Sequence, residues 1–280
     1  MLSFTLLYFT FILPMNWNTI EFSFNRALKL SFSMKKLLFV FVMLWCCGFG
    51  LLLCRSLGLQ TQDWLMLNWN FLPFFAIGVL GLSVGVLLIR LYHDEIKERK
   101  INYRKTFSLS KKVMVEIAYL GMPLIIGYLT LWTVLGLFYL IKALPKIGWT
   151  LGIFLSFGPF LLFLSMVFLI VLFLILFFFL TPIVALRDCL PKEWIKCMLS
   201  RMSHSLLTNF VLFIIAVIPV GCILGLLMIS LNMTHAFYLS SANPLDLVLI
   251  MLPVSILLAP GVVFFFQFAA ESHILMMQKR

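Results

Sequence analysis

The stretch GIFLSFGPFLLFLSMVFLIVLFLILFFFLTPIVAL, from Gly152 to Leu186, decides the fold of this chain. It contains no charged residue, and a bilayer core of ~30 Å needs only about 20 apolar residues in a helix. The run therefore predicts a transmembrane helix, yet it is longer than one perpendicular span requires. Gly158 and Pro159 predict a break, which leaves an interfacial stretch before a span from about Phe160. Strong tilt of one long helix is the alternative.

Five further apolar runs lie on either side of this stretch. The chain of 280 residues is 63% apolar and only 11% charged, so it has too little polar surface to cover a water-soluble globule. We therefore expect an all-α polytopic membrane protein with six transmembrane helices. The predicted spans are Leu37–Cys54, Asn70–Tyr92, Val113–Ile141, Gly152–Leu186, Leu206–Leu231 and Leu245–Ala270.

Basic residues mark one side of these spans. Of the 21 Lys and Arg residues, 18 fall in four stretches that are separated by pairs of apolar runs, whereas only Arg55, Lys142 and Lys146 lie between them. Cytoplasmic loops carry an excess of Lys and Arg. This pattern predicts an even number of spans, with both termini in the cytoplasm.

The six spans group into three hairpins, each with an amphipathic cytoplasmic entry helix. In the first entry helix Ile20, Phe24, Leu28 and Phe32 share one face. In the third, the shared face consists of Trp194, Ile195, Met198, Leu199 and Met202. Residues 1–18 are predicted to be an apolar interfacial or re-entrant leader, with an additional span as the alternative. Residues 19–280 then form one membrane domain. Its units 19–92, 93–186 and 187–271 are candidate repeats, with a chance match of short Ser/Lys/apolar strings as the alternative.

Small and bulky residues predict how the spans pack. The pairs Gly81 with Gly85 and Gly221 with Gly225 have a spacing that permits close helix crossing. The segment Phe173–Leu180 is bulky on every face, so we expect it to meet lipid broadly.

Few residues in this sequence are suited to catalysis or to binding a metal or cofactor. No phosphate-binding Gly-rich loop, zinc helix or nucleophile elbow is present in the sequence, and the acidic residues of the loop after the second span are explained by surface salt bridges. We therefore expect no enzyme activity, no catalytic, cofactor-binding or metal-binding residues, and no cofactor. One sharper hypothesis is a polar vestibule on the cytoplasmic side, lined by Glu116, His204, Asn209, Gln267 and Glu271. Local pairing of these groups is the simpler interpretation.

The basic residues beside the spans predict the partners. A net charge of +11 placed next to apolar spans favours anionic lipid headgroups over nucleic acid. The expected headgroup contacts are Arg26, Lys29, Lys35, Lys36, Lys111, Lys112, Lys196 and Arg201. A membrane-protein partner at the inner face is a further expectation. The function predicted is a lipid-interacting structural or accessory module, with a carrier or channel for a lipid-like or weakly polar solute as the alternative.

The linker between the fourth and fifth spans carries a family resemblance. Leu180-Thr181-Pro182-Ile183-Val184, then Arg187-Asp188, then Trp194 to Arg201 running into Thr208-Asn209-Phe210, resembles the linker of bacterial six-span membrane-domain families. These include the membrane domain found beside glycerophosphodiester phosphodiesterases, whose catalytic domain has no counterpart here. The resemblance implies a multi-pass module of a bacterial cytoplasmic (inner) membrane and no hydrolase.

Overall fold

The computed structural model describes residues 17–58, 63–98, 103–143, 152–186, 191–204, 206–233 and 244–278. These residues form eight α-helices, which confirms the all-α class. The helices are α2 (Trp17–Ser31), α3 (Met34–Gly58), α4 (Asp63–Ile96), α5 (Tyr103–Ala143), α7 (Gly152–Leu186), α8 (Pro191–His204), α9 (Leu206–Met233) and α10 (Pro244–Gln278). The predicted leader lies outside the described residues, except for Trp17 and Asn18 at the start of α2.

The helices α3, α4, α5, α7, α9 and α10 are the six that are long and apolar enough to cross a membrane. They match the six predicted spans, but several extend further; α4, for example, begins at Asp63 and ends at Ile96. Hydropathy locates the lipid-compatible part of a helix, whereas backbone hydrogen bonds continue the helix into polar surroundings.

Two predicted interruptions are wrong. The helix α7 runs without a break from Gly152 to Leu186, through Gly158 and Pro159. One proline removes a single backbone hydrogen bond, and a helix in an apolar environment retains the others because no water replaces them. The helix α5 likewise runs from Tyr103 to Ala143, so its entry segment continues directly into the span instead of forming a separate helix.

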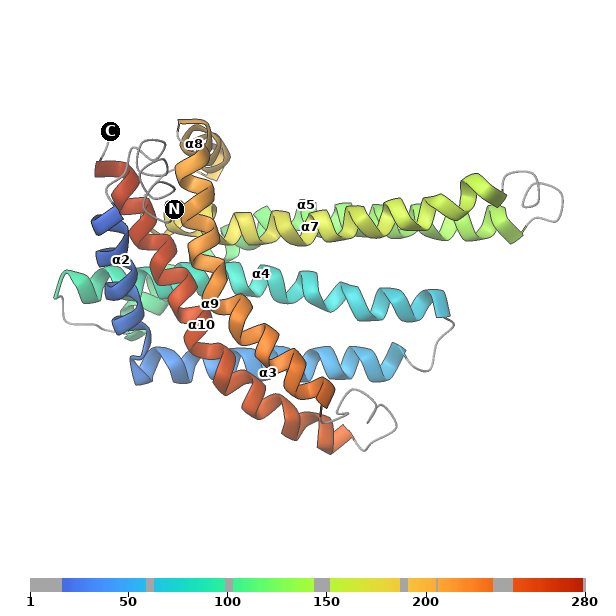
Figure 1. Cartoon of the computed structure of the whole chain (residues 1–280), viewed down its shortest axis with the longest axis horizontal. Coiled ribbons are helices and arrows are strands. Elements are labelled where there is room, and N and C mark those ends of the chain that lie inside the picture. Colours follow the sequence, from blue (N-terminus) through green and yellow to red (C-terminus); the bar gives the residue numbers. More distant parts are fainter. Residues whose placement is uncertain are drawn as a thin grey trace, which may run out of the picture.

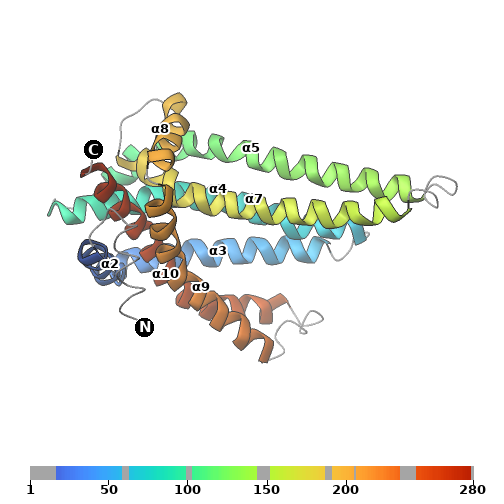
Figure 2. The ribbon, with the colours of Figure 1, turned by 45° about the horizontal axis from the view of Figure 1, so that its top comes forward.

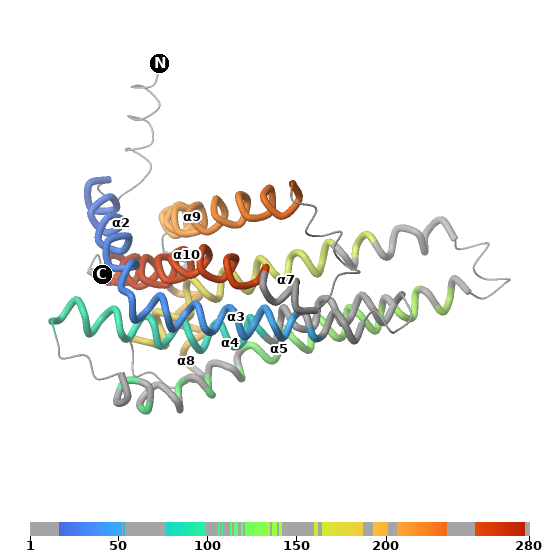
Figure 3. The backbone as a smooth tube through the Cα atoms, turned by 90° about the horizontal axis from the view of Figure 1, so that it is seen from below, coloured from blue at the N-terminus to red at the C-terminus, as the bar shows by residue number. Residues whose placement is uncertain are grey.

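Figure 1 shows α3, α4, α5 and α7 lying side by side, while α9 and α10 cross them obliquely. The consecutive pairs α3 and α4, α5 and α7, and α9 and α10 each pack together, as the three predicted hairpins require. Figures 2 and 3 show α5 and α9 at opposite sides of the bundle. The helix α10 lies between them and packs on α2, α3, α4, α7 and α9, which makes it the central element.

The core forms where α10 meets α4 and α7. Phe266 of α10 is 4% exposed, and its ring lies edge-on to Phe177 at 5.9 Å between centroids. Gly85 of α4 faces the same ring: a Cβ atom there would lie 2.7 Å from Phe266 Cζ and closer still to Cε1. The absence of a side chain at Gly85 therefore lets α4 and α10 approach closely.

The segment Phe173–Leu180 is part of this core, so its predicted broad exposure to lipid is wrong. Phe173, Phe178, Phe179 and Leu180 are at most 5% exposed. A run that is bulky on every face can equally face lipid or fill a helix interface, because both surroundings are apolar. The aromatic side chains of α10 select the second outcome.

The two predicted glycine pairs lie in different surroundings. Gly81 lies against the Phe177 ring, since a Cβ atom on it would be 3.1 Å from Phe177 Cζ, and Gly85 lies against Phe266. Gly221 and Gly225 are exposed on α9, and a Cβ atom on either would have no neighbouring atom within 4 Å. The first pair is at a helix crossing as predicted, whereas the second is not at a contact within the described part of the chain.

The short helices α2 and α8 lie at one end of the bundle (Figure 1). Their apolar faces are divided between protein and surroundings. In α2, Ile20 is buried and the Phe24 ring packs edge-on against Phe264 of α10 at 5.0 Å, while Leu28 of α2 and Phe32 directly after it are 38% and 61% exposed. In α8, Trp194 and Met198 are buried, whereas Ile195 and Leu199 are at least half exposed. Each short helix therefore packs on the bundle by one side and presents apolar side chains on another.

Candidate functional site

A polar cluster lies at the end of the bundle where α2 packs on α10. We name it the polar end cluster and define it as Arg26, Lys36, Tyr92, Glu95, Gln267 and Glu271. Its members come from α2, α3, α4 and α10, and the last turns of α4 and α10 meet the start of α3 there. Segments that are far apart in sequence, including two of the four basic stretches, thus converge at one end.

Glu271 is the centre of the cluster. Its side chain is 1% exposed, and its carboxylate accepts hydrogen bonds from Arg26 Nη2 and from Tyr92 Oη, the latter at 2.5 Å. Tyr92 is fully buried on α4. Because a buried carboxylate is costly unless it is paired and hydrogen-bonded, these two donors explain how α10 holds an ionisable side chain inside an apolar bundle.

Arg26 joins this ion pair to the surface. Its side chain is 35% exposed and its guanidinium lies over the Phe22 ring, 5.4 Å from the centroid. The hydrogen bond with Glu271 raises the pKa of Arg26, an effect that exceeds the opposing effect of burial. The guanidinium therefore stays charged, and it connects the interfacial helix α2 to the central helix α10.

Lys36 and Glu95 form a second ion pair. Lys36 Nζ donates to Glu95 Oε2 at 2.5 Å, and the ammonium lies 5.8 Å from the centroid of the Tyr92 ring. Tyr92 thus links the two pairs, through its hydroxyl to Glu271 and through its ring face to Lys36. Lys36 was expected at lipid headgroups, but its side chain is 3% exposed and faces the bundle because Glu95 compensates its charge there.

Gln267 lies one turn before Glu271 on α10 and is fully buried. Its Nε2 atom donates to the backbone oxygen of Leu30 at 3.4 Å, which binds the end of α2 to α10. The Oε1 atom of Gln267 has no hydrogen-bond partner among the described residues. Near this level Arg90 Nε of α4 donates to the Ala185 carbonyl of α7 at 3.2 Å. Polar contacts therefore join four spanning helices and α2 at this end.

The structure describes the side chains of four of the five residues of the predicted vestibule. Gln267 and Glu271 are together, buried and hydrogen-bonded, and their partners come from α2 and α4, far away in the sequence. Glu116 is half-buried on α5, which packs mainly on α4 and α7, and Asn209 is buried near the start of α9. The side chain of His204 lies outside the described residues. A hydrated vestibule shared by the five residues stays a prediction.

The predicted headgroup contacts differ in their exposure. Lys29, Lys35 and Lys196 are exposed, in contrast to Lys36. The side chains of Lys111, Lys112 and Arg201 lie outside the described residues.

Sequence reasoning did not select Tyr92 and Glu95 as site residues. Their signal was available: they lie three residues apart, directly at the end of the apolar run of α4, where one helical face carries both. A buried Glu271 also requires an opposite charge, but nothing in its own helix identifies Arg26 as the partner.

The cluster can hold helices together through charge and hydrogen bonding. Within the described part of the chain, no group of three His, Cys, Asp or Glu side chains is placed to hold a metal ion. The acids of the cluster are each engaged by a cation from another helix. No protein-family model, curated protein or solved structure matches the chain.

Proposed function

We propose that this chain is a lipid-interacting structural or accessory module of a bacterial cytoplasmic membrane, without enzyme activity of its own. Both termini lie in the cytoplasm in this proposal, and the resemblance to six-span bacterial membrane domains agrees with it. The function rests on a multi-pass membrane architecture of six long apolar helices.

One observation carries the proposal: α2 is attached to the spanning bundle by one face and offers a lipid-compatible face to its surroundings. The attached face includes Ile20 and Ala27, which are at most 3% exposed. The other face presents Phe22, which is 64% exposed, together with the cation Lys29, and Trp17 is 50% exposed at the start of the helix. Exposed aromatic side chains beside basic residues are typical of helices that lie in the headgroup region of a membrane.

The polar end cluster supports a static role for this end of the molecule. A carrier needs polar groups that a solute or ion can reach and leave. Glu271 is buried and is held by Arg26 and Tyr92, and Lys36 is buried and held by Glu95. These contacts fit groups that position helices better than groups that exchange partners with a solute.

The test compares the melting temperature of the full chain in nanodiscs of phosphatidylcholine with that in nanodiscs containing phosphatidylglycerol. A ligand that binds the folded state raises its stability. Each well-placed Lys or Arg contributes roughly 1 kcal/mol of attraction to an anionic surface, which corresponds to about 2–4 °C for a chain of this size. We expect the melting temperature to be higher by at least that amount with phosphatidylglycerol.

High salt is the control, because it screens exposed charges much more than buried pairs. We expect salt to remove the difference between the two nanodiscs. Equal melting temperatures at low salt would reject the proposal. Lipid scrambling in proteoliposomes that is abolished by Glu271→Ala would favour the carrier instead.

A further inference from the structure

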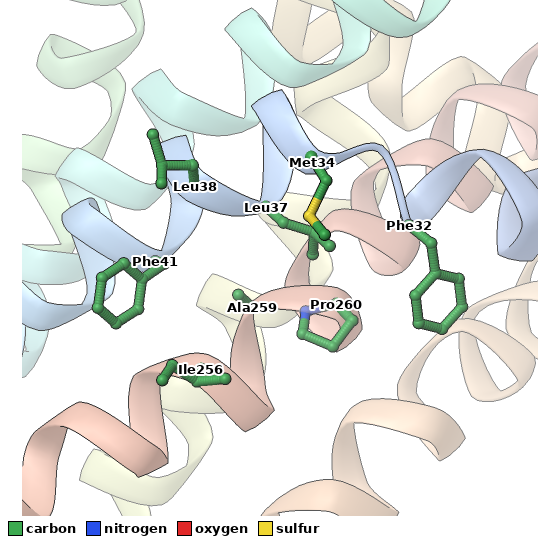
Figure 4. Close-up of a pocket in the computed structure, with 8 residues that line it drawn as sticks. All are labelled: Phe32, Met34, Leu37, Leu38, Phe41, Ile256, Ala259 and Pro260. Atoms are coloured by element: carbon green, nitrogen blue, oxygen red, sulfur yellow. The ribbon is translucent and has the colours of Figure 1, made fainter.

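An apolar groove lies between the start of α3 and the middle of α10, and Figure 4 shows the side chains that line it. Its volume is about 390 Å³. The lining residues are Phe32, Met34, Leu37, Leu38, Phe41, Ile256, Ala259 and Pro260. All of them are apolar, so the groove has no side chain that would bind a polar solute.

The sequence explains why a hollow forms at this crossing. Ala259 is 2% exposed and too small to fill the space between the two helices. Pro260 has no backbone N–H to donate to the Ile256 carbonyl, so the helix bond between these two groove residues is missing. Met34, Leu37, Leu38 and Phe41 follow helical spacing and form the opposite wall.

The groove opens towards the medium around the bundle. Met34, Leu38 and Ile256 are 83%, 67% and 52% exposed. Both walls belong to candidate membrane spans, Met34–Leu51 and Ile250–Met277. In a bilayer the surrounding medium at such spans is hydrocarbon, so a segment of an acyl chain is the occupant that matches the lining.

The groove begins at the level of α2. Gln267 bonds to the Leu30 backbone at the end of α2, and Pro260 lies about 10 Å further along α10, at ~1.5 Å per residue. Met34 to Phe41 covers a similar length of α3. An acyl chain in the groove would therefore have its headgroup at the end where α2 meets α3.

Two cations lie at that end. Lys29 precedes Phe32 by one helical turn on the exposed face of α2, and Lys35 is adjacent to Met34 on α3. Both side chains are exposed, whereas Lys36 is turned into the bundle by its pairing with Glu95. Two exposed cations thus neighbour groove residues in the sequence at this end, which complements the phosphate of an anionic lipid.

We propose that this groove holds one acyl chain of an anionic glycerophospholipid, with the lipid phosphate at Lys29 and Lys35. The site rests on the proposed lipid-interacting function and gives it a specific ligand class. The groove orders the chain by apolar contact, and the two ammonium groups select the headgroup by charge.

The experiment titrates the full chain in detergent with dioleoylphosphatidylglycerol or dioleoylphosphatidylcholine and measures bound lipid by native mass spectrometry. We expect the wild type to bind phosphatidylglycerol more tightly. Two cations that each contribute about a factor of five account together for about 25-fold, so Lys29→Glu/Lys35→Glu should weaken the binding of phosphatidylglycerol at least about 25-fold. The control is Lys97→Glu, which reverses an exposed cation just beyond α4 that is not among the expected headgroup contacts and should bind like the wild type.

A second variant tests the acyl-chain part of the site. Ile256→Trp fills the groove from its exposed α10 wall and should reduce retention of both lipids at least 10-fold. If this variant has no melting transition, Leu38→Trp makes the same test from the α3 wall, where the side chain is also exposed.

The outcomes separate the site from the function. Binding of phosphatidylglycerol by Lys29→Glu/Lys35→Glu, or by a folded groove variant, at the wild-type level would overturn the groove site. If the wild type still prefers phosphatidylglycerol in that case, the lipid binds elsewhere and the proposed function stands. A wild type that binds the two lipids equally would contradict both.

Discussion

Glu271 shows how single residues at the polar end cluster depend on one another. Its buried carboxylate accepts from Arg26 and Tyr92, which lie on α2 and α4. Removing one partner leaves a charge or donor inside a poorly polar environment, and such unpaired groups cost more than the intact pair contributes. The contribution of each of these side chains to stability therefore depends on the presence of its partners.

A double-mutant cycle tests this dependence. We expect Arg26→Ala and Glu271→Ala each to lower the free energy of unfolding by about 1–3 kcal/mol, because each leaves its partner uncompensated. The double variant should lose less than the sum of the single variants, with a coupling energy of about 1–3 kcal/mol. The measurement is denaturant unfolding in detergent micelles.

Glu193→Ala is the control for this cycle, because Glu193 is an exposed acid on α8. Its effect should be within about 0.5 kcal/mol. Additive losses at Arg26 and Glu271 would show that the two side chains do not act as a pair.

The helix α10 packs closely on its neighbours because a large side chain on one helix meets a small one on the other. On α10 the residues Phe264, Phe265, Phe266 and Phe268 are all buried, and α4 meets them with Gly85. The Phe266 ring is confined by Phe177 and Phe265, with ring centroids at 5.9 and 5.5 Å. A Cβ atom at Gly85 would overlap this ring, so the crossing of α4 and α10 favours glycine at this point.

Gly85→Ala tests this crossing. We expect the variant to lose about 1–3 kcal/mol of stability through overpacking, although alanine favours helices more than glycine does. The loss should appear as a lower melting temperature. Phe266→Leu, combined with Gly85→Ala, should restore part of it because the smaller side chain makes room.

Gly221→Ala is the matched control on α9, since no atom lies within 4 Å of a Cβ at that position. We expect unchanged or slightly higher stability, by up to about 1 kcal/mol. Equal effects of alanine at the two glycines would contradict a tight crossing at Gly85.

The whole molecule has one end that carries the polar end cluster together with α2 and α8. In the sequence, the basic stretches predict that this end faces the cytoplasm, since membrane insertion retains Lys and Arg on that side. Lys97 lies just beyond α4 at this end, whereas Met233 ends α9 after a long apolar span. Both are exposed, so they report the two sides of the membrane.

Cysteine labelling tests the orientation, in a background where the six native cysteines are replaced. Met233→Cys should react with an impermeant maleimide in intact cells. Lys97→Cys should react only after permeabilisation. The reverse pattern would invert the proposed orientation. Labelling of both positions from one side would contradict the odd number of spans between them, and with it the membrane-spanning role of α9.

The sequence alone determined the helical class, the six long apolar helices and their grouping in consecutive pairs, because hydropathy over about 20 residues is a local property of the chain. It also selected Gln267 and Glu271 as polar residues at the cytoplasmic end of the last span. It was wrong about the break at Gly158-Pro159, the separate entry helix of the second unit and the lipid exposure of Phe173–Leu180.

Only the tertiary structure decided which partners meet. Arg26 and Glu271 are 245 positions apart, and Lys36 and Glu95 are 59 apart, so no local pattern identifies either pair. The same limit applies to Phe173–Leu180: lipid and a helix interface are both apolar, and hydropathy does not distinguish them. Burial and pairing depend on which helices are neighbours in space, and that is settled by complementary shapes and charges such as Gly85 with Phe266 and Glu271 with Arg26.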